Sequence, residues 1–188
     1  MDWQQILKNK KQTFSWSDKI PDRKIIDQIL DEVHNYCPSK QNAVPYKIEV
    51  LDWSDTPRRN QIFRNTWCDA DTPDDRRNPQ VMAPYLFTFS YRDSDDPGAN
   101  SNSLMEIGLA AMFVVLSAVN YGLDYGFCGC YHGDDMNLAI GVGYAGENMG
   151  TYWNPILQQN METPGIEPGN STNDDDNKPN KSDYIKFD

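Results

Sequence analysis

The feature that most constrains the fold is one long apolar segment in the second half of the chain. Residues 107–119 are apolar except for Gly108 and Ser117. The segment is shorter than the roughly 20 apolar residues needed to cross a bilayer, so it predicts a core helix and no membrane span. The predicted helix covers about residues 103–121 and ends at Gly122, a residue type typical of helix ends. A helix that is apolar on nearly every side belongs at the centre of a globular domain.

Length and charge narrow the class of protein. The chain has 188 residues, which is enough for one domain with its own hydrophobic core. Aromatic residues make up 12% of it, too many for a disordered chain. There are 28 acidic residues against 17 lysines and arginines, a formal net charge of −11. Because nucleic acids and anionic membranes bind basic surfaces, this balance excludes both as default partners.

The N-terminal residues and the cysteines predict a cytoplasmic protein. The first residues contain neither the basic region nor the apolar region of a signal peptide. None of the four cysteines belongs to a C-x-x-C pair, so we interpret them as reduced thiols and predict no metal site. These cysteines are Cys37, Cys68, Cys128 and Cys130.

Hydrophobic periodicity predicts further helices and strands around the central helix. Asp18 and Pro21 are the start signals of a second helix, and the Cys37-Pro38 pair ends it. Other helices are predicted over residues 3–11 and 58–67, and strands over residues 46–51, 85–91, 125–128 and 138–144. These elements predict an α+β fold, with helices around a small mixed or antiparallel sheet.

The composition changes near the C-terminus. Residues 162–182 are rich in Pro, Gly, Asn, Ser and Asp, which indicates an extended arm, and residues 183–187 alternate as a short strand does. We therefore expect one domain over residues 1–161 and a C-terminal arm over residues 162–188.

Four segments, in this order, together resemble one known family. Residues 37–46, Cys-Pro-Ser-Lys-Gln-Asn-Ala-Val-Pro-Tyr, are similar to its A-P-S-x-x-N-x-Q-P-W motif, and residues 82–86 to its A-P strand. Residues 106–130 are similar to its central helix and the G-x-x-x-x-W-I-G-G strand end that follows. Lys178-Pro179 is similar to its closing basic-Pro segment. The family is the nitroreductase family of flavin-dependent oxidoreductases.

The resemblance implies an activity, a cofactor and an assembly. It implies an FMN-dependent enzyme that uses NAD(P)H to reduce a small organic acceptor, such as a nitroaromatic or a quinone, by ping-pong hydride transfer. It also implies an intertwined homodimer that holds FMN at the subunit interface, with the C-terminal arm around the partner. No side-chain acid or base is required, because the flavin carries the chemistry.

The resemblance also assigns residues to the cofactor. Lys10, Lys11 and Gln12 stand where the family binds the FMN phosphate, and Lys178 stands at a second basic position. The strand end at Gly129 and Cys130 would lie against the flavin ring, and residues 38–42 would form the wall from the partner subunit. The residues of that wall are Pro38, Ser39, Lys40 and Asn42, and Arg76 and Arg77 are candidates for positive charge near the ring.

Departures from the family pattern leave alternatives open. The phosphate arginine is replaced by Lys10 and the serine by Gln12, and only residues 131–137 are left where the family usually has a helix. The first alternative is therefore a non-catalytic or flavin-free relative, and another is a specialised branch that acts on flavin itself or on a halogenated substrate. Lys10 and Lys11 could also serve the helix dipole, and the glycines of residues 126–133 could serve tight packing.

Overall fold

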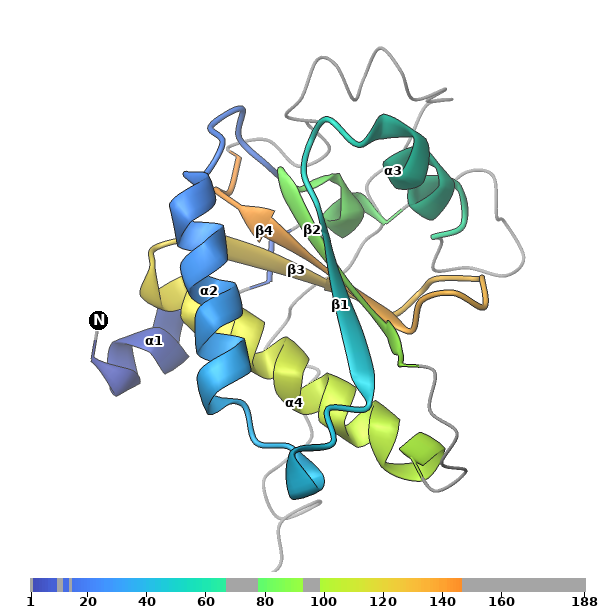
Figure 1. Ribbon diagram of the computed structural model, residues 1–188. Coiled ribbons are helices and arrows are strands. Elements are labelled where there is room, and N and C mark those ends of the chain that lie inside the picture. The colour runs from blue at the N-terminus through green and yellow to red at the C-terminus, as the bar shows by residue number, and fades with distance from the viewer. Residues whose placement is uncertain (1, 10–11, 14, 67–77, 93–98, 147–188) are drawn as a thin grey trace, which may run out of the picture.

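The computed structural model describes residues 2–9, 12–13, 15–66, 78–92 and 99–146 of the chain (Figure 1). The helices are α1 (Trp3–Asn9), α2 (Arg23–Tyr36), α3 (Thr56–Arg64) and α4 (Ala99–Asn120), with 3-10 turns η1 (Lys40–Asn42) and η2 (Pro79–Met82). The strands are β1 (Tyr46–Leu51), β2 (Tyr85–Tyr91), β3 (Asp124–Cys128) and β4 (Leu138–Gly143). The helices and strands predicted within the described residues are all present, with ends that differ by a few residues, whereas the strand predicted over residues 183–187 lies outside them.

The four strands form one antiparallel sheet in the order β1-β2-β4-β3, so the sheet among the described residues is antiparallel and not mixed. The strands β3 and β4 form a hairpin in which Gly126 pairs with Gly141. The inner strand β4 is buried at every position because other elements cover both faces of the sheet. The strands β1 and β3 are the two edges.

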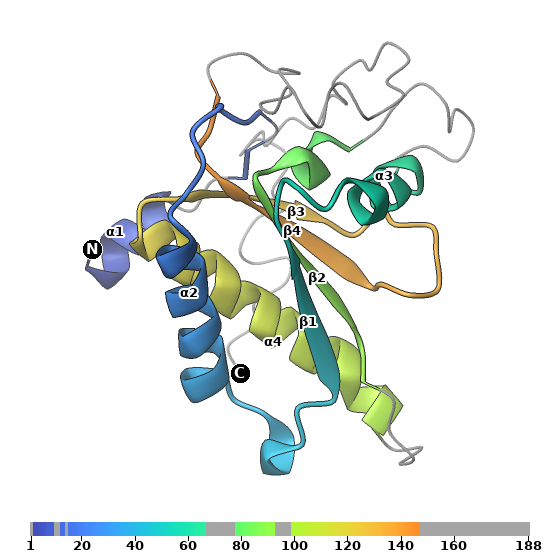
Figure 2. The ribbon, with the colours of Figure 1, turned by 45° about the horizontal axis from the view of Figure 1, so that its top comes forward.

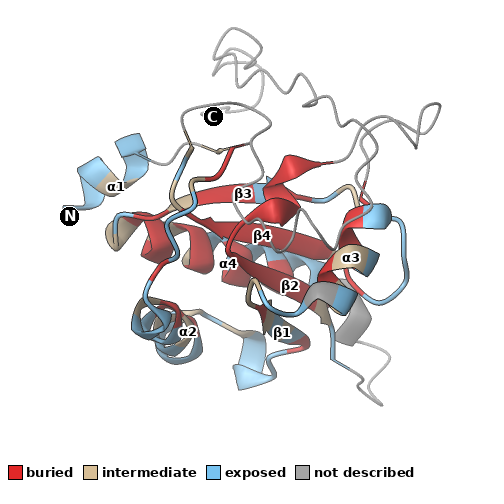
Figure 3. Cartoon of the chain, turned by 90° about the horizontal axis from the view of Figure 1, so that it is seen from above, coloured by how far each residue is buried: buried red, intermediate tan, exposed pale blue. Residues whose placement is uncertain are grey.

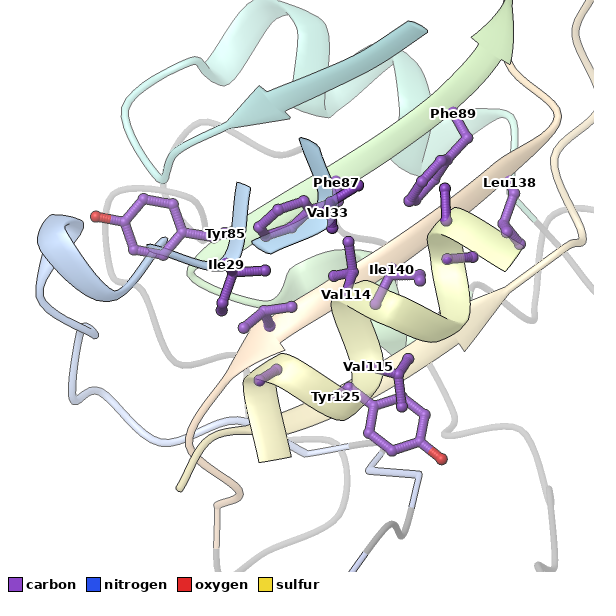
Figure 4. Packing of buried hydrophobic residues seen from close by; sticks show 14 of the residues in the cluster. Ile29, Val33, Tyr85, Phe87, Phe89, Val114, Val115, Tyr125, Leu138 and Ile140 are labelled. Atoms are coloured by element: carbon purple, nitrogen blue, oxygen red, sulfur yellow. The ribbon is translucent and has the colours of Figure 1, made fainter. Parts of the chain in front are cut away.

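Helices cover the two faces of the sheet unequally (Figures 2 and 3). On one face, α2 and α4 pack against alternate strand residues such as Phe87, Phe89 and Ile140 (Figure 4). On the other face, the strand neighbour Leu86 packs with α3 and η2 in a second cluster that contains Trp16. Consecutive residues of β2 thus enter opposite clusters, as the alternation of a strand requires.

The helix ends have clear local causes. The helix α2 begins at Arg23, later than predicted, because Asp22 and not Asp18 caps it: the Asp22 carboxylate accepts the Lys24 N–H at 2.9 Å. The helix α4 ends at Asn120, one residue before the predicted end, and Gly122, with φ +75°, lies in the predicted capping position. The Leu123 N–H donates to the Ala118 carbonyl at 2.9 Å, which completes a Schellman motif.

One buried arginine joins α3 to the sheet. The Arg59 side chain is 2% exposed and donates hydrogen bonds to the carbonyls of Leu51, Val81 and Ala83. Burial lowers the Arg59 pKa to about 10, against the opposing charges of nearby aspartates. The guanidinium therefore satisfies three buried carbonyls at the point where β1, η2 and α3 meet.

Two predictions concern α4 and the C-terminus. The stretch Ser103–Asn120 of α4 is long and apolar enough to cross a membrane by length and composition, but 56% of it is buried in the fold. This burial is typical of the core helix of a soluble domain, as the sequence predicted.

The arm over residues 162–188 lies outside the described residues, so the boundary near residue 161 stays a prediction.

Candidate functional site

The predicted cofactor residues that the structure describes fall into two groups. Gln12, Gly129 and Cys130 lie along or just beyond β3, and Pro38, Ser39, Lys40 and Asn42 lie just before β1. Because β1 and β3 are opposite edges of the sheet, the two groups do not meet within one chain (Figure 1). The other predicted residues, Lys10, Lys11, Arg76, Arg77 and Lys178, lie outside the described part of the chain.

The segment that contains Gln12 lies along the outer edge of β3. Gln12 forms a parallel bridge with Tyr125, and the Thr13 N–H donates to the Tyr125 carbonyl at 2.8 Å. The Gln12 side-chain amide donates to the Phe127 carbonyl at 3.1 Å. The observed role of Gln12 is therefore to attach the segment that follows Lys10 and Lys11 to β3.

The glycines of the β3 hairpin serve two different purposes. A Cβ on Gly126 would lie 2.7 Å from the Gln80 side chain and 2.9 Å from the Thr13 carbonyl oxygen, so this glycine is needed for packing. A Cβ on Gly129 would meet no atom within 4 Å, and Gly129 is exposed. The sequence suggested either tight packing or contact with a ligand for the glycines of this segment. Packing accounts for Gly126, while the space beside Gly129 is open to a ligand.

The two cysteines beside Gly129 differ in burial. Cys128 is 1% exposed and its sulfur accepts a hydrogen bond of 3.1 Å from the Asn78 amide, whereas Cys130 is partly buried. Cys37, Cys128 and Cys130 are in no disulfide, and no metal-binding group of His, Cys, Asp or Glu occurs within the described ranges.

A polar cluster holds the loop that follows Gly129. The Tyr131 hydroxyl donates to Asp135 Oδ1 at 2.6 Å, and Arg58 Nη1 donates to Asp135 Oδ2 at 2.6 Å. The hydrogen bond from Tyr131 and the charge of Arg58 hold the Asp135 pKa below its ordinary value, although partial burial opposes them. The short loop over residues 131–137 is thereby tied to α3, and the backbone beside Gly129 is held at both ends.

The second group lies on a loop that we call the η1 loop, residues 38–44. Its Ser39 hydroxyl donates to Glu106 Oε2 at 2.7 Å, and the Lys40 N–H donates to Glu106 Oε1 at 3.1 Å. The Ser39 oxygen also accepts the Val44 N–H at 2.8 Å. A carboxylate on α4 therefore organises the η1 loop.

The backbone of the η1 loop is strained. Gln41, Asn42 and Val44 have φ angles of +56°, +55° and +42°, in the left-handed region that favours glycine. Each such residue costs of order 1–3 kcal/mol, and a β-branched valine is the least suited of the three. All three side chains are exposed, so core packing does not impose this conformation.

The η1 loop presents polar groups to solvent. Lys40 and Asn42 are exposed, and Lys40 is the one cation of the predicted site that the structure describes. The Arg92 side chain donates to the Ala43 carbonyl at 2.9 Å, which fixes the far end of the loop. The arrangement offers a cationic, hydrogen-bonding surface on the outside of this chain.

Sequence reasoning assigned no role to Glu106. Its side chain is 4% exposed, and it is the one charged residue in the predicted helix 103–121. Because a buried charge needs hydrogen-bond partners, a lone acid in an apolar helix was a signal that a polar contact lies there. The sequence could not name Ser39 and Lys40 as those partners.

Comparisons with known proteins bear on the fold. No family model matches the sequence, and no curated protein matches it. Among solved structures, a nitroreductase family protein from Clostridium novyi NT matches with a TM-score of 0.64 and 16% identity, over 81% of this chain and 92% of that chain. The FMN-dependent nitroreductase NfnB from Mycobacterium smegmatis, in complex with NADPH, matches with a TM-score of 0.65 and 10% identity. This match covers 98% of this chain and 97% of that chain.

A third match is an FMN-dependent nitroreductase from Clostridium difficile R20291, with a TM-score of 0.58 and 15% identity over 81% of this chain and 92% of that chain. At these identities the likeness is one of fold. It confirms the predicted nitroreductase-like α+β fold.

Proposed function

We propose that this chain is a divergent member of the nitroreductase family that binds FMN as a homodimer and oxidises NAD(P)H in the cytoplasm. When bound, FMN would supply the transfer of two electrons and a proton, as hydride, from NAD(P)H to a small organic acceptor such as a nitroaromatic or a quinone. The FMN-dependent nitroreductases that share this fold support the proposal. The observation that carries it is the open backbone at Gly129, beside a strand end that is otherwise closely packed.

The backbone at this strand end suits the edge of a flavin ring in its chemistry. A planar ring needs backbone N–H and carbonyl groups at its edge and no side chain in its way. Gly126, three residues earlier, has its free side filled by Gln80, whereas the free side of Gly129 is empty. The Tyr131–Asp135–Arg58 cluster would keep the Gly129 backbone in place as a ligand binds.

The cationic residues have the task of holding the phosphate. The segment attached to β3 by Gln12 leads back to Lys10 and Lys11, which we propose as phosphate ligands together with Lys178. Charge-assisted hydrogen bonds are the strong ones, and a dianionic phosphate on a chain of net charge −11 needs them. Arg76 and Arg77 remain candidates for positive charge near the ring. No residue of the chain has to donate or accept a proton as a catalyst.

The separation of the two groups supports a dimeric site. The η1 loop and the β3 end lie at opposite edges of the sheet, so a partner has to bring one to the other. The helix α4 exposes Leu104, Met105, Leu109 and Met112, each more than 40% exposed, on an apolar surface that adjoins Glu106. A second copy that covers this surface would bring its own η1 loop to the flavin.

One observation favours the flavin-free alternative. The Gln12 side-chain amide already donates to the Phe127 carbonyl, so its N–H is engaged inside the fold. A relative that keeps the dimer and has lost the phosphate site would look the same in this region. The presence of bound flavin separates the two functions.

The first experiment is an absorbance spectrum of the purified full chain, before and after incubation with FMN and desalting. One retained flavin per chain supports the proposal, and oxidation of NADH or NADPH with a nitroaromatic or quinone acceptor then tests turnover. No retained flavin and no oxidation would favour the flavin-free relative.

A pair of glycine variants tests the location of the site. Gly129→Val should weaken FMN binding about tenfold or more without loss of stability, because its side chain enters open space that the ring would fill. Gly126→Ala should instead lower the melting temperature, because its methyl group meets Gln80. If Gly129→Val binds FMN as tightly as the wild type does, the flavin ring does not lie against this strand end.

A further inference from the structure

We propose that Glu106 is a positioning residue for FMN, and that it acts by holding the η1 loop in the conformation that meets the flavin. This inference rests on the proposed function and deepens it. Glu106 is buried in α4, and it accepts hydrogen bonds from the Ser39 hydroxyl and the Lys40 N–H. Among the described residues, these two donors are the hydrogen-bond partners that account for an acid at this point of an apolar helix.

The backbone of the η1 loop is strained, so it needs hydrogen bonds such as those to Glu106 to stay in its conformation. Three residues, Gln41, Asn42 and Val44, have positive φ angles although none is glycine. Their side chains are exposed, so hydrogen bonds and not packing must stabilise this backbone. Strained backbone of this kind persists where the surroundings hold it firmly, and it is concentrated at ligand sites.

The hydrogen bonds form a chain from α4 to the far side of the loop. Glu106 receives the Ser39 proton, which orients the Ser39 oxygen to accept the Val44 N–H at 2.8 Å. The same carboxylate takes the Lys40 N–H at 3.1 Å. One buried carboxylate thus fixes both ends of the segment that carries Lys40 and Asn42, the exposed polar side chains of the proposed wall.

The position of Glu106 links the site to the proposed dimer surface. Its neighbours Leu104 and Met105 are 58% and 62% exposed, while Glu106 itself faces the interior of its own protomer. The loop that would approach the partner's flavin is therefore fixed to the same helix that would contact the partner. Such an arrangement holds Lys40 and Asn42 in one geometry before FMN binds, which reduces the entropy lost on binding.

The test compares four variants of the full chain. Glu106→Met removes both acceptors while it keeps the length of the side chain and a good helix former. Ser39→Ala breaks the same network from an exposed loop, where the fold is not at risk. Glu106→Gln keeps one acceptor oxygen, so this conservative variant should retain part of the hydrogen-bond network. Glu32→Met is the control, because it removes another carboxylate that makes a long-range hydrogen bond: Glu32 of α2 accepts the Tyr121 hydroxyl at 2.6 Å.

Two readouts are used. Amide hydrogen exchange at Lys40 and Val44, in protein without flavin, reports the anchoring of the loop directly. FMN affinity and the visible circular dichroism of bound flavin report the consequence for the site. We expect Glu106→Met and Ser39→Ala to expose both amides and to weaken FMN about tenfold, the loss that follows from one hydrogen bond to a charged group. Glu106→Gln should be intermediate, and Glu32→Met should leave all these readouts unchanged.

The double variant Ser39→Ala with Glu106→Met should bind FMN no more weakly than either single variant, because both remove the same network. Suppose that the Lys40 and Val44 amides of Glu106→Met exchange faster while its FMN affinity and its flavin dichroism stay those of the wild type. That result would overturn the positioning role and leave the proposed function standing. An equal loss of affinity in Glu32→Met would overturn it too. A wild-type chain that binds no FMN would overturn both proposals.

Discussion

Arg58 Nη1 lies 2.6 Å from Asp135 Oδ2, and this contact joins α3 to the loop between β3 and β4. Tyr131, two residues after Gly129, donates to the other oxygen of the same carboxylate. The loop contains no helix, and a helix from elsewhere in the chain, α3, supplies its support. The strand end proposed for the flavin therefore depends on a polar contact between segments far apart in the sequence.

Asp135→Asn should destabilise the fold slightly, and the effect should depend on pH. The Asp135 carboxylate has a pKa below its ordinary value of 3.8, so its charged form stabilises the fold above that value and the gain is lost as the pH falls through the lowered pKa. Because Asp135 is half exposed, we expect about 0.2–1 kcal/mol at pH 7. Urea unfolding of both proteins at several pH values measures this. A difference between the two proteins that does not shrink in acid would contradict the assignment.

The exposed pair of Arg23 and Asp27, on adjacent turns of α2, provides the control. Its side chains are 61% and 54% exposed, so Asp27→Asn should change the stability by about 0.3–0.5 kcal/mol or less. Neither variant should alter the secondary structure.

Arg59→Lys should be more harmful than its conservative character suggests. Lysine keeps the charge but lacks the fork that donates to three carbonyls at once, so buried carbonyls lose their partners. We expect a loss of about 2 kcal/mol in the free energy of unfolding. Arg64→Lys, on the exposed side of the same helix, should stay within about 0.5 kcal/mol. Equal stabilities of the two variants would contradict the role of Arg59.

Two glycine-to-alanine variants should have opposite effects on stability. In Gly141→Ala the new methyl group would lie 2.1 Å from the Gln80 carbonyl oxygen, and the backbone would have to move, which costs about 1–3 kcal/mol. In Gly108→Ala nothing lies within 4 Å, and the better helix former should stabilise α4 by about 0.5–1 kcal/mol. Thermal unfolding compares them. A stable Gly141→Ala would show that Gln80 and η2 can move away from the sheet.

The double variant Met105→Lys with Leu109→Lys should weaken self-association. Both side chains are exposed on α4, and charges there cannot be covered by an apolar partner surface without loss of hydration. Sedimentation at several concentrations should show a dimer for the wild type and a monomer for the variant, and the variant should also lose FMN. Leu7→Lys, at an exposed leucine of α1, is the control and should stay dimeric. A dimeric double variant would place the interface elsewhere.

Sequence reasoning found the elements because each buries apolar residues at its own period. The alternation of residues 85–91 and the apolar run of residues 107–119 are local patterns, and β2 and α4 lie where these patterns predicted. Gly122 ends α4 for an equally local reason. Asp22 was missed as the cap of α2 because Asp18 and Asp22 look alike until the backbone around them is known.

The site was less predictable because its contacts are long-range. Ser39 and Glu106 are separated by 67 positions, and no local pattern connects them. The difference between Gly126 and Gly129 depends on Gln80, which lies on another element. The resemblance indicated which segments could bind the cofactor, and it could not assign each residue its role.

The position of β4 between β2 and β3 has a consequence for synthesis on the ribosome. The strand β2 leaves the ribosome long before β4, yet its second set of backbone partners is in β4. Until residues 138–143 are synthesised, the edge of β2 that pairs with β4 has no partner strand. The apolar side of α4 then also lacks the part of its packing surface that β4 provides. The sheet can therefore close only late, and the unfinished chain exposes a strand edge that another chain could join. Chaperone demand should be greatest in the interval between synthesis of β2 and completion of the β3–β4 hairpin.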